Sequence, residues 1–317
     1  GGAALMAGGA GGTDVMNVDD NIIVNNVSSH EGGGISLNDA PNVRVFNNTI
    51  MKNTTTATAL TSNGSPAPAG LSTSANSDPM QASLPATAPT FSNPLVFNNI
   101  FSDNRAGTRS LGTVIGIGAA GDPTAINYWD MGVADGTGTL TPSYTIMQST
   151  QGVGGGSNNQ VLSDPLVIAQ YNTGVDFAAW RTNPNFIGAI MVVVDTLPSL
   201  LGNYHIQAGS PAVDTGTANA QATAAPGVDF DNQVRPFSPI APARFDIGAD
   251  EYGTNVAQPA QFYYTINAGL AALGATLMDN PIFLPFVSAS VTQDAETGYV
   301  QVSLDKFKVF LPAINSK

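Results

Sequence analysis

One pattern occurs three times in the chain: IVNNV at residues 23–27, VFNNTI at residues 45–50 and VFNNIF at residues 96–101. Two apolar residues precede each Asn pair, and an apolar residue follows within two positions. When parallel strands stack at roughly 4.8 Å, equivalent side chains of successive turns lie above one another. Asn at a corner can then hydrogen-bond its neighbours, and it tolerates left-handed backbone geometry. The pattern predicts one column of stacked pairs, formed by Asn25, Asn26, Asn47, Asn48, Asn98 and Asn99.

The spacing of the first two copies, 22 residues, matches one turn of a solenoid. Between them, GISL at residues 34–37 is a further short strand, bounded by Gly and by NDAP at residues 38–41. A β-helix coil holds two or three such strands with sharp corners. In the alternative interpretation, the Asn pairs mark ordinary turns between antiparallel strands. The shared register favours an all-β fold, a right-handed parallel β-helix, because parallel crossovers are almost always right-handed.

Two long stretches interrupt the repeat. Residues 54–92 are rich in Thr, Ser, Ala and Pro, with Asp78 as their single charge. Residues 107–157 carry Tyr128, Trp129 and several glycines. Because insertions in repeat proteins fall at corners, both stretches are predicted to be long loops on a β-helix that spans residues 1–253.

Residues 254–317 differ from the repeat region. An apolar stretch precedes residues 299–311, which alternate apolar and polar side chains with a slip of one residue, as a β-bulge would require. We predict that residues 254–317 form a small β-rich cap or docking segment. The strand at residues 299–311 could add to a sheet edge of another subunit, or it could fold back on its own chain.

The charge balance excludes several function classes. Lys and Arg total 10 against 23 Asp and Glu, which gives a formal net charge of -13. Nucleic acids and anionic lipids attract clustered Lys and Arg, so neither is an expected partner. The chain has no Cys, and its apolar runs are too short to span a bilayer as helices. It starts at Gly1 without a signal sequence, which suggests a processed or truncated product.

Three phrases near the C-terminus are the most distinctive: YHIQAGSPAVDTG at residues 204–216, DFDNQVRP at residues 229–236 and DIGADEY at residues 246–252. In this order they resemble the end of right-handed parallel β-helix repeat proteins of the choice-of-anchor type, which are secreted bacterial surface proteins. The chain has Asn232 where the family usually has Gly, and Ile206 where it has Leu. The resemblance covers roughly residues 15–253 and implies the fold and a secreted, extracellular location. It implies no activity.

Oxygen ligands at alternate positions are typical of Ca²⁺ sites. The second and third phrases therefore predict a possible calcium site formed by Asp229, Asp231, Asn232 and Asp246. In the alternative interpretation Asp214, Asp231 and Asp246 accept backbone N–H bonds at tight corners, and Arg235 or Arg244 pairs with one of them. The two histidines, His30 and His205, are far apart in the sequence, and His205 is expected to point outward from its strand. A typical zinc or copper enzyme site is not predicted.

Catalytic constellations are incomplete in the sequence. A lyase needs a basic residue beside a cation, and Arg44 and Lys52 lie in no recurring set. A glycosidase needs two carboxyl groups, for which Asp122, Asp130 and Asp135 are the candidates, although each also suits a loop. No catalytic residue is predicted. Side chains that could stack on sugar rings are Tyr128, Trp129 and Trp180.

We therefore expect a structural or adhesive protein of the cell surface, a possible self-assembling subunit of a fibre or surface layer. Its expected partners are copies of itself or upstream β-helix coils, because an uncapped β edge invites pairing. Polysaccharide is a further possible partner, and no membrane insertion is expected. The alternatives are a carbohydrate-binding module and a pectate-lyase-like enzyme.

Overall fold

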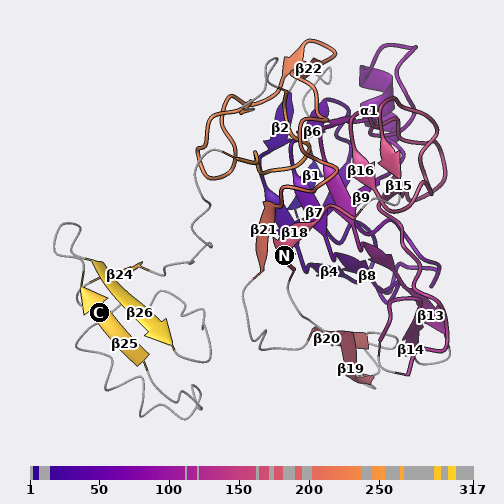
Figure 1. Ribbon diagram of the computed structural model, residues 1–317. Coiled ribbons are helices and arrows are strands. Elements are labelled where there is room, and N and C mark those ends of the chain that lie inside the picture. The colour runs from indigo at the N-terminus through magenta and orange to yellow at the C-terminus, as the bar shows by residue number, and fades with distance from the viewer. Residues whose placement is uncertain are drawn as a thin grey trace. The chain divides into compact units, whose positions relative to one another are not determined.

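In the computed structural model of the chain (Figure 1), the described residues are 3–6, 15–110, 113–119, 121–161, 164–170, 175–180, 190–194, 202–237, 244–253, 265–267, 289–293 and 299–304. The chain separates into two compact units. The first contains residues 1–169, 174–194 and 204–256, and the second contains residues 170–173, 195–203 and 257–317. Nearly all described elements are β strands, and the one described helix is α1 (Asp78–Ser83).

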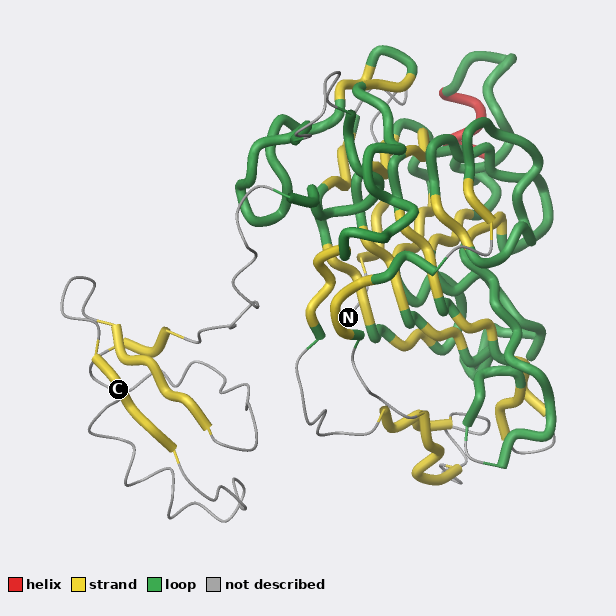
Figure 2. Tube along the Cα trace, in the orientation of Figure 1, coloured by secondary structure: helices red, strands yellow, loops and turns green. Residues whose placement is uncertain are grey.

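Four sheets of parallel strands make up most of the first unit (Figure 2). The first sheet contains β2 (Met16–Asp19), β6 (Val43–Phe46) and β10 (Leu95–Phe97). The second contains β3 (Ile22–Val24), β7 (Thr49–Met51), β11 (Ile100–Ser102), β16 (Ile146–Met147) and β17 (Gln160–Val161). The third contains β4 (Val27–Ser28), β8 (Thr54–Thr55) and β12 (Arg105–Ala106). The fourth contains β1 (Ala3–Met6), β5 (Ile35–Asn38), β9 (Leu71–Thr73) and β15 (Met131–Val133).

The chain visits these four sheets in a fixed order, which defines three successive passes. The first pass is β2, β3, β4 and β5, the second is β6, β7, β8 and β9, and the third is β10, β11, β12 and β15. In the first three sheets, equivalent residues are 27 positions apart between the first two passes and 51 apart between the second and third. In the fourth sheet the intervals are longer, because Ile35 pairs with Leu71 and Leu71 with Met131. This all-β arrangement of parallel sheets is compatible with a β-helix.

The core lies between the sheets, because alternate side chains of each strand point inward. Ile35 and Leu37 of β5 are buried, as are Val43 and Val45 of β6, while Arg44 between the latter is partly exposed. Phe46 and Phe97, equivalent residues of neighbouring passes, stack with ring centroids 4.9 Å apart. Equivalent residues of successive passes, such as Val45 and Val96 or Ile50 and Phe101, belong to one hydrophobic core.

Both predicted insertions contain strands of the parallel sheets. Residues 54–92 include β8 and β9 as well as α1, and residues 107–157 include β15 and β16. The latter stretch also forms an antiparallel hairpin of β13 (Thr108–Ser110) and β14 (Thr113–Ile115). Thr and Ser fill β8 and most of β9, and these hydroxyl side chains are buried. Residues 54–92 were predicted to be a loop because they lack alternating apolar residues. Thr nevertheless fits a β strand well, as in β8 and β9.

The Asn pairs form two ladders rather than one column. In the first, Asn48 Oδ1 accepts bonds from Asn21 N and Nδ2, and Asn99 Oδ1 accepts the same two bonds from Asn48 at 3.0 Å each. In the second, the same bonds join Asn26 to Asn53 and Asn53 to Asn104. Asn104 Nδ2 then donates to the fully buried Asp130.

The predicted register of the first copy is wrong. Asn47 pairs with Asn98, but Asn25 lies beside Lys52 and Asn26 beside Asn53, one corner further along the pass. Each pass turns two corners five residues apart, and at each corner a left-handed residue is followed by an Asn that belongs to one of the ladders. The left-handed positions are Asp20, Asn47 and Asn98 at one corner, and Asn25, Lys52 and Asp103 at the other. Because the two corners resemble each other, the sequence suggested a period of 22 rather than 27.

Shorter sheets complete the described chain. β18 (Val167–Ala169) pairs with β21 (Asn203–Ile206), and antiparallel pairs join β19 (Val175–Trp180) to β20 (Ile190–Val194) and β22 (Asn219–Ala220) to β23 (Thr223–Ala224). In the second unit β26 (Tyr299–Leu304) lies between β24 (Thr265–Asn267) and β25 (Ala289–Gln293), antiparallel to both. Thus β26 pairs within its own chain on both edges. Residues 305–311 of the predicted docking strand lie outside the described residues.

Candidate functional site

Residues 204–237 and 244–253, which carry the three distinctive phrases, form hydrogen bonds to corner residues of the passes. Asn98 exchanges two hydrogen bonds with the Thr217 backbone, at 2.7 and 2.9 Å. Gly248 N donates to Asn98 O, and Gly248 O accepts from Asn47 Nδ2 at 3.4 Å. Further along, Gln160 Nε2 donates to Pro211 O. The phrases therefore form a strap that hydrogen-bonds several passes through their corner residues.

Buried carboxylates hold the strap in shape by accepting backbone N–H groups. Asp229 Oδ1 accepts from the amides of Asp231 and Gln233, and its Oδ2 accepts from that of Glu251. Asp246 accepts from the amides of Asp214 and Tyr252. A carboxylate that accepts several backbone N–H bonds stabilises a tight turn. Asp229 and Asp246 therefore hold the turns of the strap in place.

Arg235 lies at the centre of this acidic network. Its guanidinium donates to Gly248 O at 3.0 Å and to Ala249 O at 2.8 Å. It also lies 3.6 Å from the Glu251 carboxylate and 3.5 Å from that of Asp20 in the first pass. The side chains of Arg235 and Glu251 are completely buried. The network thus links the strap to the first pass through a buried charge.

Burial raises the pKa of several of these carboxyl groups, so they hold their protons to a higher pH than usual. Removal from water raises the pKa of Glu251 to about 8, and the neighbouring Asp246 charge adds to the rise. Burial likewise raises the pKa of Asp246 and that of Asp20 to about 7 each, against the opposing effect of Arg235. The folded chain therefore retains protons that the unfolded chain releases near pH 4.

The free energy of unfolding is expected to fall as the pH rises from 5 to 8. Because the pKa values of these acids are higher in the folded state, this state binds more protons throughout that window, and stability is lost as the pH passes the folded pKa values. The expected loss is at least about 1.4 kcal/mol, the equivalent of one pKa unit. Urea unfolding at pH 5, 6.5 and 8 measures it. Glu251→Gln should flatten the profile, and stability that increases toward pH 8 would contradict the argument.

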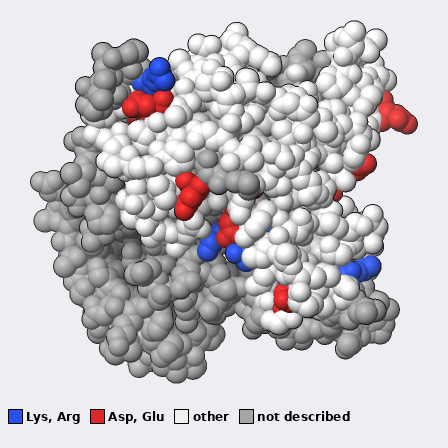
Figure 3. All heavy atoms as spheres, turned by 45° about the vertical axis from the view of Figure 1, so that its right-hand side comes forward, with Lys and Arg blue, Asp and Glu red and all other residues white. Residues whose placement is uncertain are grey.

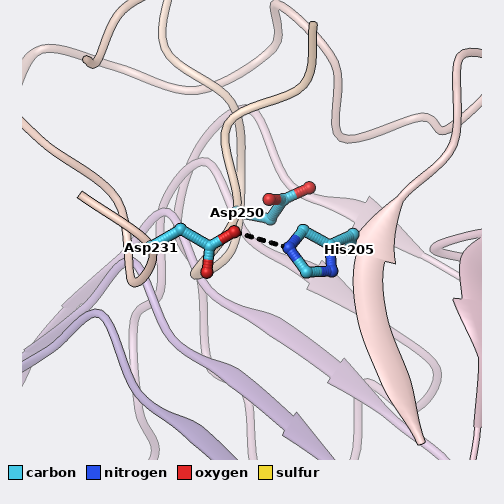
Figure 4. A group of neighbouring side chains, drawn as sticks. All are labelled: His205, Asp231 and Asp250. Atoms are coloured by element: carbon cyan, nitrogen blue, oxygen red, sulfur yellow. Dashed lines mark hydrogen bonds and ion pairs between the residues drawn. The ribbon is translucent and has the colours of Figure 1, made fainter. Parts of the chain in front are cut away.

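One group in the strap brings together side chains suited to metal binding: His205, Asp231 and Asp250 (Figure 4). Each offers a ligand atom, and these atoms all lie within 4.8 Å of one another. His205 Nε2 is 2.7 Å from Asp231 Oδ2, and its ring lies against Phe230. Contrary to the sequence expectation, His205 is buried, with 3% of its surface exposed. It is enclosed because the turn with Asp231 and the segment with Asp250 close over β21.

The predicted calcium ligands are divided between different groups. Asp229 and Asp246 serve the strap backbone as acceptors, Asp231 lies with His205, and Asn232 is an exposed residue in the left-handed region at φ 67°. Among the described residues, His205, Asp231 and Asp250 form the group that could share an ion. Of the four predicted calcium ligands, this group contains only Asp231. The sequence reasoning missed Asp250, although it stands in the phrase that also supplied Asp246.

The aromatic candidates for sugar stacking are part of the fold where the structure describes them. Trp129 is partly buried, and its Nε1 donates to Met131 O at 3.0 Å. Tyr128 is also partly buried, beside Arg105. Trp180 belongs to β19, but its side chain lies outside the described part of the structure.

The candidate glycosidase carboxylates hold loops in place. Asp122 accepts from the amides of Gly116 and Thr124, and Asp135 accepts from those of Ala75 and Thr137. Asp130 accepts from the amides of Gln148 and Ser149. All three carboxylates thus have local structural partners.

Comparison of the chain with protein-family models, with curated proteins and with solved structures finds no match. The family resemblance therefore rests on the three phrases of the strap. In the part of the chain that the structure describes, no helix has the length and apolar character needed to cross a membrane.

Proposed function

We propose that the passes are coils of a right-handed parallel β-helix, and that the protein is a structural or adhesive component of a cell surface. The cyclic order of the four parallel sheets supports the fold, and the known bias of parallel crossovers supports the hand. The resemblance of the strap phrases to choice-of-anchor proteins supports secretion and an extracellular location. On the face drawn in Figure 3, uncharged residues cover most of the described surface. A surface with few charges is compatible with packing against other copies.

The observation that carries the proposal is the open edge of the first pass. Among the described strands, β2, β3 and β4 each end their sheet and have a neighbour on one side only. Three apolar side chains there are exposed: Val15 by 54%, Met16 by 38% and Val27 by 40%. Unpaired strand edges beside apolar side chains favour pairing with another chain. The proposed occupant is a second copy of this protein.

Val27→Lys is expected to weaken self-association by about tenfold or more, which corresponds to 1.4 kcal/mol. A Lys on an edge strand opposes pairing, because its charge would have to be buried against the partner. Sedimentation velocity over a range of concentrations measures the change, and electron microscopy of concentrated samples shows whether fibres form.

Leu60→Lys is the matched control, because Leu60 is 73% exposed in a loop outside the sheets. This variant should associate as the original chain does. If the original chain sediments as a monomer at every concentration, or if both variants weaken association equally, the first pass is not a self-association edge.

The carbohydrate-binding alternative has less support. Trp129 would have to present its ring to a sugar, but its indole nitrogen is bonded to Met131 O and lies against Gly132 and Gly152. A carbon atom added to either glycine would stand within 3.0 Å of that nitrogen. The indole therefore has a packing role at this position.

A further inference from the structure

His205, Asp231 and Asp250 come from three separate parts of the strap. His205 is on β21, Asp231 is in the turn after Asp229, and Asp250 belongs to the last phrase. Asp231 points toward His205, and the Asp250 carboxylate lies beside them, with one ligand atom of each residue within 4.8 Å of the other two (Figure 4). His205 and Asp250 are buried, whereas the Asp231 side chain is 30% exposed. The group therefore has two fixed members and one member that reaches solvent.

One carboxylate oxygen of Asp250 has no hydrogen-bond partner among the described residues. Its Oδ2 accepts a hydrogen bond from Ile206 N at 2.8 Å, which fixes the orientation of the carboxylate. Its Oδ1 is buried and has no hydrogen-bond partner among the described residues, while 3% of the residue is exposed. Leaving a buried acceptor unpaired costs about 1–3 kcal/mol, and more if it is charged, so such an atom calls for a partner.

We propose that His205, Asp231 and Asp250 bind a divalent transition metal ion, with Zn²⁺ as the best match. An imidazole nitrogen together with carboxylate oxygens suits Zn²⁺, whereas Ca²⁺ takes six to eight oxygen ligands. Three protein ligands leave a fourth tetrahedral position for water on the exposed side. The ion supplies the missing partner of Asp250 Oδ1 and offsets the negative charge of two carboxylates.

The ligand atoms lie within 4.8 Å of one another, so they have to move to reach the spacing of ligands on one ion. His205 Nε2 and Asp231 Oδ2 are 2.7 Å apart, and two ligands of one tetrahedral Zn²⁺ ion are separated by about 3.4 Å. Asp231 can supply the difference because its side chain is partly exposed, while Asp229 holds the backbone of its turn through the Asp231 and Gln233 amides. The same exposed side gives the ion a path from solvent.

The test uses the imidazole NMR signals of the full chain, which has only two histidines. The protein is first treated with a chelator and then titrated with ZnCl₂, while metal analysis measures the stoichiometry. One equivalent of Zn²⁺ is expected to shift the signals of His205 and to leave those of His30 in place. Absence of binding, or a response of His30 in place of His205, would overturn the proposal.

Asp250→Asn is the most informative variant, because the amide oxygen can still accept from Ile206 N while the charge is lost. It is expected to reduce zinc affinity by at least about tenfold, and His205→Gln should do the same. His30→Gln is the matched control: His30 Nδ1 is 2.7 Å from Glu31, but this pair belongs to no group of three among the described residues. Equal zinc affinity in the original chain and Asp250→Asn would refute the site, even if His205→Gln failed to fold.

Discussion

Replacing Asn48 by Leu is expected to lower the free energy of unfolding by about 3–5 kcal/mol. Asn48 is completely buried, and its Nδ2 donates to Val18 O at 2.7 Å, Phe46 O at 2.9 Å and Asn99 Oδ1 at 3.0 Å. Its Oδ1 accepts both bonds from Asn21. Leu fills a similar volume but leaves these groups unpaired, and each buried unpaired group costs about 1–3 kcal/mol.

Urea unfolding of both proteins measures the difference. Asn48 is a better test than Asn47, because Asn47 has a φ of 51°, so Leu there would also add backbone strain. Asn63→Leu is the control, since Asn63 is exposed in a loop and its Oδ1 accepts a local hydrogen bond from Ser65 N. A loss below about 1 kcal/mol for Asn48→Leu would mean that the ladder contributes little to stability.

Replacing Arg235 by Met is expected to destabilise the chain by about 3–5 kcal/mol at pH 8, because removing one member of a buried charge network leaves the others uncompensated. Glu251 and Asp20 would lose their nearest positive group, and the carbonyls of Gly248 and Ala249 would lose their donors. The defect should be smaller at pH 5, where the raised pKa of Glu251 keeps its carboxyl neutral. Thermal and urea unfolding at both pH values test this.

A second change separates lost charge compensation from lost packing. Adding Glu251→Gln to Arg235→Met should recover part of the stability, because the buried negative charge is removed together with its partner. Arg44→Met, at a partly exposed position of β6, controls for the general loss of an arginine. Additive effects of the two changes at Arg235 and Glu251 would argue against coupling between them.

The sequence predicted the parallel strands and the register of the second and third copies, but not the register of the first. Residues 45–53 and 96–104 align without a gap in the structure, because strand and corner residues recur together. The predicted register of the first pass was wrong because Asn25-Asn26 resembles Asn47-Asn48 in sequence but lies at the other corner. Local sequence encodes the shape of a corner, whereas the choice between two similar corners depends on which strands lie above and below.

The candidate site was harder to predict, because its members are brought together by the strap. A single His on a short strand gives no sign that a turn 26 residues later will cover it. The acidic phrases did indicate backbone-binding carboxylates, and Asp246 is one of them. Asp229, which was expected only as a calcium ligand, is another. Which of the remaining acids keeps a free oxygen follows only from the packed arrangement.

The strap also has a consequence for the order of folding. Stacked repeats that touch only their neighbours can fold and fray one at a time. Here the last part of the first unit bonds residues far earlier in the chain, through Arg235 to Asp20, Gly248 to Asn47 and Thr217 to Asn98. Contacts over such sequence distances are slow to form. During synthesis, the early passes therefore leave the ribosome before the strap that hydrogen-bonds them. We expect the first unit to unfold as one cooperative unit only after the chain has been made as far as residue 253.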